Sequence, residues 1–489
     1  MKRVSFLVLV LYPFLLFSQR TRVDSPTPLQ KLNIVEQLIK EYYVDPISES
    51  ELVDGAILGM LKKLDPYSTY QTAAEVALYN QRLDGYFYGV GIETLMAKDV
   101  LLVSDIYPNS SAEKAGLRLG DVIVEIDNKP IPSDNSALQL LLRSPKNSEL
   151  SLLVHRQQHI EEIILKRSKV TLSSVATSFK IDDDYGYIKL NSFAQGTVKE
   201  LKAALRKLTK DTSCKGILLD LRGNGGGLLS SAIDVANEFL TVNQEIVSAR
   251  GNKLDVGSFK AKGNGLFQQG KLLVLVDKKT ASASEIVAAA VQDWDRAIIV
   301  GEPTIGKGLV QRPFDLPDGS RLNLTIANYY SPSGRSIQRP YRNDTIVQVD
   351  YKTRVLNRPV IGSGGVMPDL EITKEMCRDY SLVAELVNSH DYRIHLLNYV
   401  TEVRRGLLKQ YHTSFERYNK EFMLDMLDGY DLGSWLSMQK KLTNKQKTIL
   451  CQQTAMLVTR YTWGVEAYYK VMQTIDPYLL KSREVLRLN

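Results

Sequence analysis

The sequence is poor in cysteine and histidine, which removes several kinds of functional site from consideration. Its 489 residues hold three cysteines, an odd number without the close spacing of metal ligands or of a disulfide framework. We therefore expect unpaired, buried thiols and no metal site. The cysteines are Cys214, Cys377 and Cys451, and the five histidines are His155, His159, His390, His395 and His412.

Long basic runs, nucleic-acid motifs, internal repeats and low-complexity tracts are also absent. The formal net charge of +7 is modest for this length, so we expect no nucleic-acid partner. A chain of 489 residues exceeds the usual roughly 100–200 residues of one domain, and its 44% of hydrophobic residues can fill several cores. The sequence therefore predicts a multidomain globular protein.

The sequence contains no apolar run long enough to cross a bilayer comfortably. Val4–Phe17 follows two basic residues, is 14 residues long and is interrupted by Pro13. This pattern predicts a signal peptide at residues 1–18 and export to the periplasm or to the outer face of the cytoplasmic membrane. The alternative is an uncleaved membrane anchor.

A serine-rich turn between a strand and a helix is the first candidate site. The apolar run Lys271–Val276 predicts a strand buried on both faces of a sheet, and Glu285–Asp293 has helical periodicity. Backbone N–H groups at such a helix start can hold an oxyanion, so Ser282 or Ser284 is a candidate nucleophile. Serine caps helices far more often than it catalyses, and spacing alone does not choose between the two.

A glycine loop with a lysine follows the next predicted strand, Ala297–Val300. The spacing from Gly301 to Lys307 matches a phosphate-binding loop, but Gly308 stands where Ser or Thr would hold magnesium, and Pro303 removes an N–H group. We reject the nucleotide interpretation. Apolar neighbours favour a partly desolvated Lys307, whose amine would be neutral more often and able to accept a proton, against the alternative of a surface lysine.

The string Thr-Ala-Ser-Ala-Ser-Glu-Ile, followed by Gly-Glu-Pro-Thr-Ile-Gly-Lys-Gly-Leu-Val-Gln, resembles the C-terminal processing (tail-specific) serine proteases. In that family the first serine of the triplet is the nucleophile and the lysine 25 positions later is the base, which selects Ser282 over Ser284 and matches Lys307. Gln311 matches the residue that orients the lysine, and Asp293 matches a structural aspartate. No histidine lies in this region, so a serine–lysine pair is expected.

Upstream, an apolar strand runs into Gly-Asn-Gly-Gly-Gly, where the backbone must approach another group closely or adopt positive φ. The resemblance implies that glycine N–H groups here form the oxyanion hole with the amide after the nucleophile. Gly226 and Ala283 are the expected donors, with Gly227 as the alternate. The chain departs from the family pattern at Gly223 and Gly225.

A second module precedes the expected protease core. Its string Ala-Gly-Leu-Arg-Leu-Gly-Asp-Val-Ile, after a glycine-containing aromatic segment, resembles a PDZ domain of the bacterial protease type. Such a domain captures a chain-terminal carboxylate on backbone N–H groups while the peptide adds as a strand. The resemblance implies a carboxylate loop at Tyr88, Gly89, Val90 and Gly91, and a role for Arg118 in linking tail binding to the active site.

The resemblance runs from about Leu29 to Leu370, and helical periodicity continues beyond it at Tyr392–Tyr411 and Gln446–Val471, where Trp435 and Trp463 are expected to pack internally. The expected fold class is α/β multidomain: a ClpP/crotonase-like α/β protease core with an inserted PDZ domain, N-terminal helices and a mostly helical C-terminal extension. The expected order is a signal peptide at 1–18, a helical segment at 24–84, a PDZ domain at 85–168, a serine protease core at 169–372 and the extension at 373–489.

Together these features predict an exported serine endopeptidase that binds the C-terminal tails of protein substrates. It needs no cofactor or metal, and it forms either a monomer or a homo-oligomer. The alternative is a proteolytically silent PDZ scaffold that binds tails for a partner enzyme. The presence of Ser282, Lys307 and Gln311 together argues against the scaffold.

Overall fold

The computed structural model describes most of the chain in segments separated by short gaps. These segments are residues 26–143, 146–156, 159–210, 214–251, 255–341, 350–411 and 442–487. The chain forms two compact units, residues 1–64 and 65–489. The predicted signal peptide and Trp435 lie outside the described residues. None of the helices that the structure describes combines the length and the apolarity needed to cross a membrane.

Two capped helices make up the described part of the first unit, and they are α1 (Pro28–Tyr42) and α2 (Glu49–Leu61). Thr27 precedes α1, and its hydroxyl accepts the Gln30 N–H while the Gln30 side chain accepts the Thr27 N–H. Ser48 and Glu51 repeat this arrangement at the start of α2. Such reciprocal caps satisfy N–H groups that a helix start leaves without partners.

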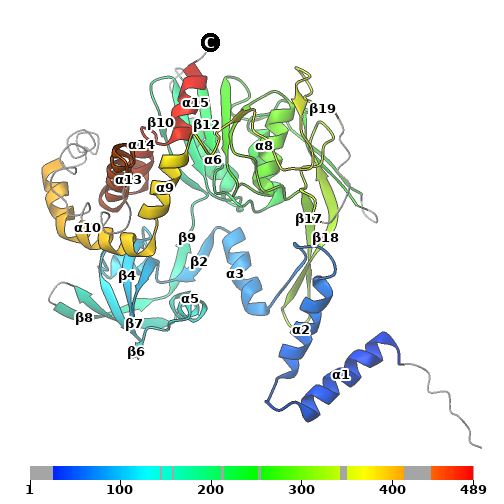
Figure 1. Ribbon diagram of the computed structural model, residues 1–489, viewed down its shortest axis with the longest axis vertical. Coiled ribbons are helices and arrows are strands. Elements are labelled where there is room, and N and C mark those ends of the chain that lie inside the picture. The colour runs from blue at the N-terminus through cyan, green and yellow to red at the C-terminus, as the bar shows by residue number, and fades with distance from the viewer. Residues whose placement is uncertain are drawn as a thin grey trace, which may run out of the picture. The chain divides into compact units, whose positions relative to one another are not determined.

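The predicted PDZ module in the second unit is an antiparallel sheet with two helices (Figure 1). The strand order is β3 (Ile92–Ala97), β4 (Val100–Ile106), β5 (Val122–Ile126), β7 (Glu149–Arg156) and β8 (His159–Lys166), with β6 (Lys129–Pro130) beside β5. The helices are α4 (Ser111–Lys114) and α5 (Asn135–Arg143). Leu101 and Val103 enter the core of the module, whereas Leu102 packs in a different cluster, because successive strand residues face opposite sides.

A helix and a strand pair join this module to the rest of the unit. They are α3 (Ala73–Leu83) and the antiparallel pair β2 (Tyr86–Gly89) and β9 (Ser168–Thr171).

A six-stranded sheet forms the centre of the protease core. Its order is β10 (Val175–Lys180), β11 (Tyr185–Leu190), β12 (Gly216–Asp220), β15 (Lys271–Val276), β16 (Ile298–Gly301) and β21 (Leu370–Glu371). All pairs except β10 with β11 are parallel. Ile217 and Val274 pack against α6 (Thr197–Thr209), α7 (Leu229–Asn237) and α8 (Ala283–Asp293) on one face. The carboxyl ends of parallel strands lie at one edge of such a sheet, and ligands usually bind at that edge.

A second sheet begins where the lysine loop ends, because this loop joins β16 of the first sheet to β17 (Leu309–Asp315) of the second. Its other strands are β1 (Thr69–Gln71), β18 (Arg321–Tyr330), β13 (Glu245–Arg250) and β14 (Asp255–Lys260), with β17 paired to β18. The short strands β19 (Tyr351–Lys352) and β20 (Pro359–Val360) pair separately.

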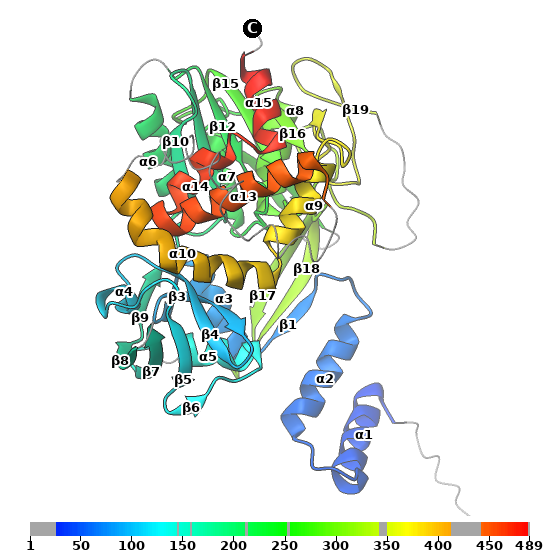
Figure 2. The same ribbon diagram turned by 60° about the vertical axis from the view of Figure 1, so that its left-hand side comes forward.

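The C-terminal extension consists of helices that cover two sheets. They are α9 (Arg378–Val387), α10 (His390–Tyr411), α13 (Asn444–Trp463), α14 (Val465–Met472) and α15 (Pro477–Arg487). Leu218 and Leu273, on the second face of the core sheet, pack with Val471 and Leu479 of the extension. Figures 1 and 2 both show α10 against the PDZ strands, and Leu102 of β4 shares a cluster with that helix. A leucine buried in this way contributes about 1.5–3 kcal/mol, so the extension is an integral part of the fold.

One predicted helix of the extension is divided in two. The periodic stretch 446–471 is interrupted at Gly464, which ends α13 and starts α14. Gly464 has φ of 90°, a conformation that glycine adopts without a steric penalty.

Candidate active site and tail-binding pocket

Ser282 lies at the N-terminus of α8 with an unusual backbone. Its φ and ψ are 56° and −116°, in a region that non-glycine residues rarely occupy. Such a conformation costs about 1–3 kcal/mol, and it occurs most often at functional sites. The helix behind it is wholly buried, which anchors the turn. Ser282 is therefore presented at the start of a rigid helix.

Glu285 connects the serine turn with the lysine loop. Its Oε2 accepts the backbone N–H groups of Ser282 at 2.8 Å and Lys307 at 2.9 Å, and its Oε1 accepts the N–H of Gly306 at 2.7 Å and the hydroxyl of Thr304. Burial raises the pKa of Glu285, although these hydrogen bonds oppose the shift. One buried carboxyl group thus holds both candidate catalytic segments.

Lys307 follows β16 and is half-buried beside Gln311 of β17. Its Nζ donates to Gln311 Oε1 at 3.0 Å and lies 5.5 Å from the centre of the Tyr67 ring. Gln311 Nε2 in turn donates to the Tyr67 carbonyl oxygen, which fixes the direction of the amide. Burial lowers the pKa of Lys307, and the charges of Glu285 and Asp65 only partly oppose this. A lowered pKa increases the fraction of neutral amine, the form that accepts a proton. Among the described residues, Lys307 Nζ and Ser282 Oγ form no hydrogen bond.

The glycine loop after β12 lies against the serine turn. A Cβ added to Gly226 would lie 3.0 Å from Ala283 N and 3.0 Å from Ser282 Cβ. The Gly226 N–H donates to Asn224 Oδ1 at 2.9 Å, so this predicted oxyanion donor is engaged in this state. Gly227 has φ of 144°, and a Cβ there would lie 2.1 Å from the Phe193 carbonyl oxygen. Within the described residues, the N–H groups of Ala283 and Gly227 have no hydrogen-bond acceptor.

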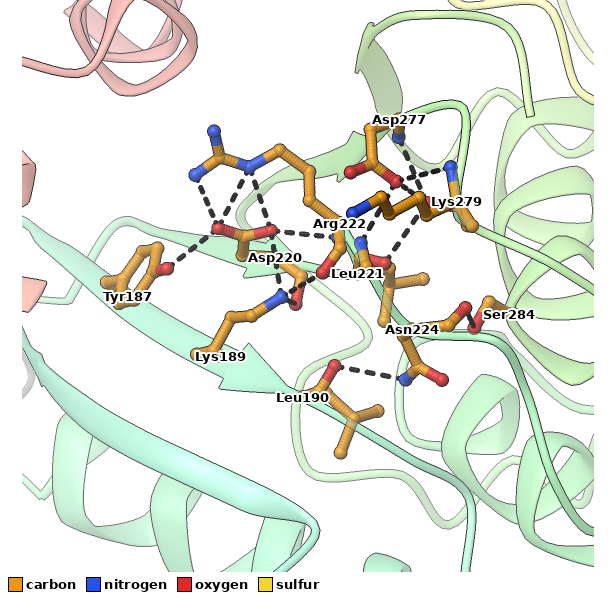
Figure 3. A network of polar contacts seen from close by, with 12 residues as sticks. Tyr187, Lys189, Leu190, Asp220, Leu221, Arg222, Asn224, Asp277, Lys279 and Ser284 are labelled. Atoms are coloured by element: carbon orange, nitrogen blue, oxygen red, sulfur yellow. Dashed lines mark hydrogen bonds and ion pairs between the residues drawn. The ribbon is translucent and has the colours of Figure 1, made fainter. Parts of the chain in front are cut away.

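A buried polar network holds the base of this loop (Figure 3). Asp220 accepts the Tyr187 hydroxyl at 2.7 Å and the Arg222 Nη2 at 2.7 Å, and Lys189 Nζ lies 3.4 Å away. Arg222 Nη1 also reaches both carboxylate oxygens of Asp476, in the extension, at 3.0 Å. Burial alone would raise the pKa of Asp220, but Arg222 and Lys189 hold it well below its usual range.

Asn224 attaches the glycine loop to its neighbours. Its Nδ2 donates to the Leu190 carbonyl oxygen at 3.0 Å, and its own carbonyl oxygen accepts the Ser284 hydroxyl at 2.9 Å and the Ala281 N–H at 3.1 Å. Figure 3 shows Asn224 between the β11 end and the serine turn. The second serine of the triplet therefore has a structural hydrogen bond.

A pocket of about 370 Å³ opens between β3 and α5 of the PDZ module. Val90 and Gly91, two of the five predicted tail-binding residues, line it. Tyr88 and Gly89 belong to β2, which pairs with β9, and neither is among the lining residues. Arg118 is exposed and also lies outside the lining residues. The sequence-based list therefore overlaps the pocket only in part.

Several site residues were not predicted. Tyr67 and Glu285 contact the lysine segment, while Gln139, Arg143 and Arg393 line the pocket. The glutamate was visible as the last residue of the serine turn, whereas Tyr67 lies in the segment predicted as helical at 24–84, to which no catalytic role was given. Nothing in the local sequence of Arg393 indicated a pocket residue. The residues that the structure describes contain no group of three or more His, Cys, Asp or Glu side chains that could hold a metal ion.

Comparison with known families assigns three parts of the chain. The model of peptidase family S41 matches residues 184–350, the PDZ domain model matches residues 102–156, and the model of the activating protease CtpB N-terminal domain matches residues 17–74. These matches, with the architecture described above, confirm the predicted α/β core with a PDZ domain.

Curated relatives carry matching names. The carboxy-terminal-processing protease of Bartonella bacilliformis is 37% identical over 317 residues, covering 63% of this chain and 72% of the relative. A probable CtpA-like serine protease of Staphylococcus saprophyticus is 29% identical over 438 residues, covering 87% of this chain and 85% of the relative.

Solved structures with detectable similarity include a photosystem II D1 C-terminal processing protease, with 27% identity and a TM-score of 0.41. That similarity covers 72% of this chain and 97% of the other. A putative S41 protease from Bacteroides fragilis has 17% identity and a TM-score of 0.44, with 76% and 97% of the two chains covered. On the identity and coverage of the curated relatives, this chain belongs to the carboxy-terminal-processing serine proteases of peptidase family S41.

Proposed function

We propose that this peptidase is exported, grips the C-terminal tail of a protein substrate in its PDZ domain, and cuts a peptide bond with Ser282 and Lys307. Ser282 Oγ attacks the carbonyl carbon while its proton passes to Lys307 Nζ. The C–N bond then breaks, and Lys307 returns the proton to the departing amine. Water attacks the remaining ester in the same way, releasing the acid and regenerating the serine.

The setting of Lys307 is the observation that carries this proposal. A lysine on a surface turn would be charged near neutral pH, with a pKa of about 10.4. Burial lowers the pKa of Lys307, and Gln311 accepts one of its N–H groups and orients it. Glu285 fixes the backbone of this lysine and of Ser282 together. A desolvated amine in a loop whose backbone is tied to the serine turn through Glu285 suits a serine–lysine mechanism.

The oxyanion that forms during attack needs donors that point at the reacting carbonyl. Ala283 N–H is the proposed first donor, because it lies next to the nucleophile and has no other acceptor among the described residues. Gly226 is the proposed second donor once its N–H leaves Asn224, and Gly227 is the alternate. We infer that tail binding drives this exchange and brings Lys307 Nζ into contact with Ser282 Oγ.

Cleavage of an unfolded protein with an apolar C-terminus tests the assignment. The wild-type protein should release fragments, whereas Ser282→Ala and Lys307→Met should be inactive with unchanged melting temperatures. Equal cleavage by wild type and Ser282→Ala would disprove the catalytic assignment. Tail binding without cleavage by any of the three would favour the silent scaffold.

The proposed location has a separate test, which uses a fusion of the first residues to a reporter that is active only outside the cytoplasm. Activity from a fusion carrying residues 1–30 and its loss when Val8 and Leu9 become Asp would support export. Fractionation then distinguishes a free periplasmic protein from one held at the membrane. An inactive fusion whose reporter protein is found only in the cytoplasmic fraction would contradict export.

A further inference from the structure

The pocket of the PDZ domain has one wall that comes from outside that domain. Arg393 of α10, in the C-terminal extension, lines it together with residues of β3 and α5. The remaining wall mixes polar groups with the apolar side chains of Phe87, Ile92 and Leu142, and these three suit an apolar side chain at the end of a tail. The strand β3 has β4 on one side and, among the described residues, no strand on the other. A peptide can therefore add along this edge and pass Arg393.

The guanidinium of Arg393 is only partly satisfied. Its Nη2 donates to the Tyr461 hydroxyl at 3.0 Å, but its Nε–H is buried and has no hydrogen-bond partner among the described residues. A buried donor without an acceptor costs about 1–3 kcal/mol, and more when it is charged. Native proteins contain few such groups, and a ligand that supplies the acceptor is one explanation.

The extension holds Arg393 in a defined place against the PDZ sheet. Gly120 of the PDZ domain approaches α10 so closely that an added Cβ would lie 1.9 Å from Thr401 Oγ1. Arg460 of α13 pairs with Asp105 of β4 at 3.2 Å. Figure 2 shows α10 lying along the upper edge of the PDZ strands. These contacts make the pocket a composite of domain and extension.

The charges in the pocket favour an anionic ligand. Its two arginines are Arg143 and Arg393, and its single carboxylate is Glu93. Glu93 already accepts the Tyr107 hydroxyl at 3.0 Å and lies 3.8 Å from Arg460. Glu93 also interacts with Arg143, but one carboxylate cannot balance two arginines, so the lining stays net positive and favours negative groups on the ligand.

The two arginines occupy different ends of the groove. Arg143 ends α5 next to Leu142, whose carbonyl oxygen accepts the Val90 N–H at 3.3 Å, so it lies at the carboxylate loop. β3 leads away from that loop, and α10 contacts β3 from outside the domain. Arg143 is thus placed for the terminal carboxylate and Arg393 for a group further up the tail.

We propose that the C-terminal extension is part of the tail-binding site and that Arg393 selects tails carrying an aspartate or glutamate within a few residues of an apolar C-terminus. This inference rests on the proposed recognition of tails by the PDZ domain. It names the chemistry of the preferred tail and gives the extension a part in specificity.

Fluorescence anisotropy with the full-length Ser282→Ala protein tests the inference without cleavage. The probes are labelled twelve-residue peptides ending in leucine, with Asp at the second, third or fourth position from the C-terminus, and the same peptides with Asn. At least one Asp peptide should bind about tenfold more tightly than its Asn partner, as expected for one charge-assisted hydrogen bond. Adding Arg393→Gln should abolish that difference while leaving the Asn peptide unchanged.

Two matched variants separate recognition from folding. Tyr461→Phe removes the hydrogen bond to Arg393 but keeps the guanidinium, so the Asp preference should persist. Arg393→Lys keeps the charge but not the Nε–H, so the preference should fall only in part. Equal weakening of Asp and Asn peptides by Arg393→Gln, or no change in any pair, would overturn the inference. If the unmodified and the C-terminally amidated peptides bind equally or not at all, tail recognition itself fails, and the inference fails with it.

Discussion

Glu285 accepts the backbone N–H of Lys307 at 2.9 Å, and this bond links the start of α8 to the loop after β16. The same carboxylate oxygen accepts the Ser282 N–H at 2.8 Å. One buried side chain, together with the backbone bond from Ile305 N–H to the Thr280 carbonyl oxygen at 3.0 Å, therefore sets the relative position of the proposed nucleophile and base. This arrangement leads to the first of five predictions.

Glu285→Gln should lower kcat about 10- to 100-fold. Glutamine offers one acceptor oxygen where the carboxyl group offers two, so at least one N–H group of the lysine or serine segment loses its partner, and bonds to charged groups are worth about 1.5–3 kcal/mol. Steady-state kinetics on a tail-bearing substrate, with circular dichroism to verify folding, measures the effect. An unchanged kcat in a folded variant would show that the carboxylate does not position the pair.

Gln311→Glu should move the rising limb of the pH–rate profile to higher pH. A carboxylate next to Lys307 Nζ favours the ammonium form and so raises the lysine pKa, which leaves less neutral amine at pH 7 to 8. In the wild-type protein that limb should lie below the reference value of about 10.4, because burial lowers the pKa of Lys307. The profile of kcat/KM against pH reports both.

Gln311→Leu, which resembles Gln311→Glu in shape, is the control for this pH shift. Gln311→Leu lacks both the charge and the hydrogen bond, so it should lose activity at all pH values without the upward displacement. A rising limb at the same pH in wild type and Gln311→Glu would mean that Lys307 is not the base.

Gly226→Ala should abolish cleavage while preserving tail binding. An added Cβ would lie 2.8 Å from the Ala281 carbonyl oxygen and 3.0 Å from Ala283 N, and φ at this position is 101°. The loop must shift away from the serine turn, which removes the proposed oxyanion donor. Gly225→Ala is the matched control, because nothing lies within 4 Å of its added Cβ. Equal activity of both variants would argue against a catalytic role for this loop.

Arg222→Met should destabilise the second unit by about 3–5 kcal/mol, because it leaves the buried Asp476 without its cation and Asp220 with Lys189 alone. Urea unfolding at pH 7 measures the change. Arg222→Lys keeps the charge but cannot form the paired hydrogen bonds, so its free energy of unfolding should lie between those of the wild type and Arg222→Met. A loss below 1 kcal/mol for Arg222→Met would show that the network carries little stability.

The same network predicts the response to acid. The pKa of Asp220 is lower in the folded protein than the value of about 3.9 for an unfolded aspartate. Its ionisation therefore stabilises the fold above pH 4, and that contribution is lost as the pH falls toward the folded pKa. Asp220→Asn should lose stability less steeply than wild type between pH 5 and pH 3.

Short-range patterns predicted much of the core correctly. The strand at Lys271–Val276 has the predicted ends, because a continuous apolar run suits only a strand covered on both faces. The helix after it begins at Ala283, two residues earlier than predicted, because Ser282 rather than Ser284 stands at its N-terminus. The assignment of Ser282, Lys307 and Gln311 as catalytic residues came from the family resemblance and stays a prediction, as do the domain boundaries.

The sequence by itself determined the order of strands and helices, the serine turn, the lysine loop and the PDZ string, because each depends on residues close together in the chain. Only the tertiary structure decided which residues from distant parts of the chain contact these segments. Tyr67 reaches Gln311, Asp476 reaches Arg222, and Arg393 reaches the tail pocket through contacts that no local spacing encodes. Arg393 lies in α10 and Asp476 directly precedes α15. Both helices bury apolar faces against sheets formed hundreds of residues earlier, and that burial places the two polar side chains at the sites.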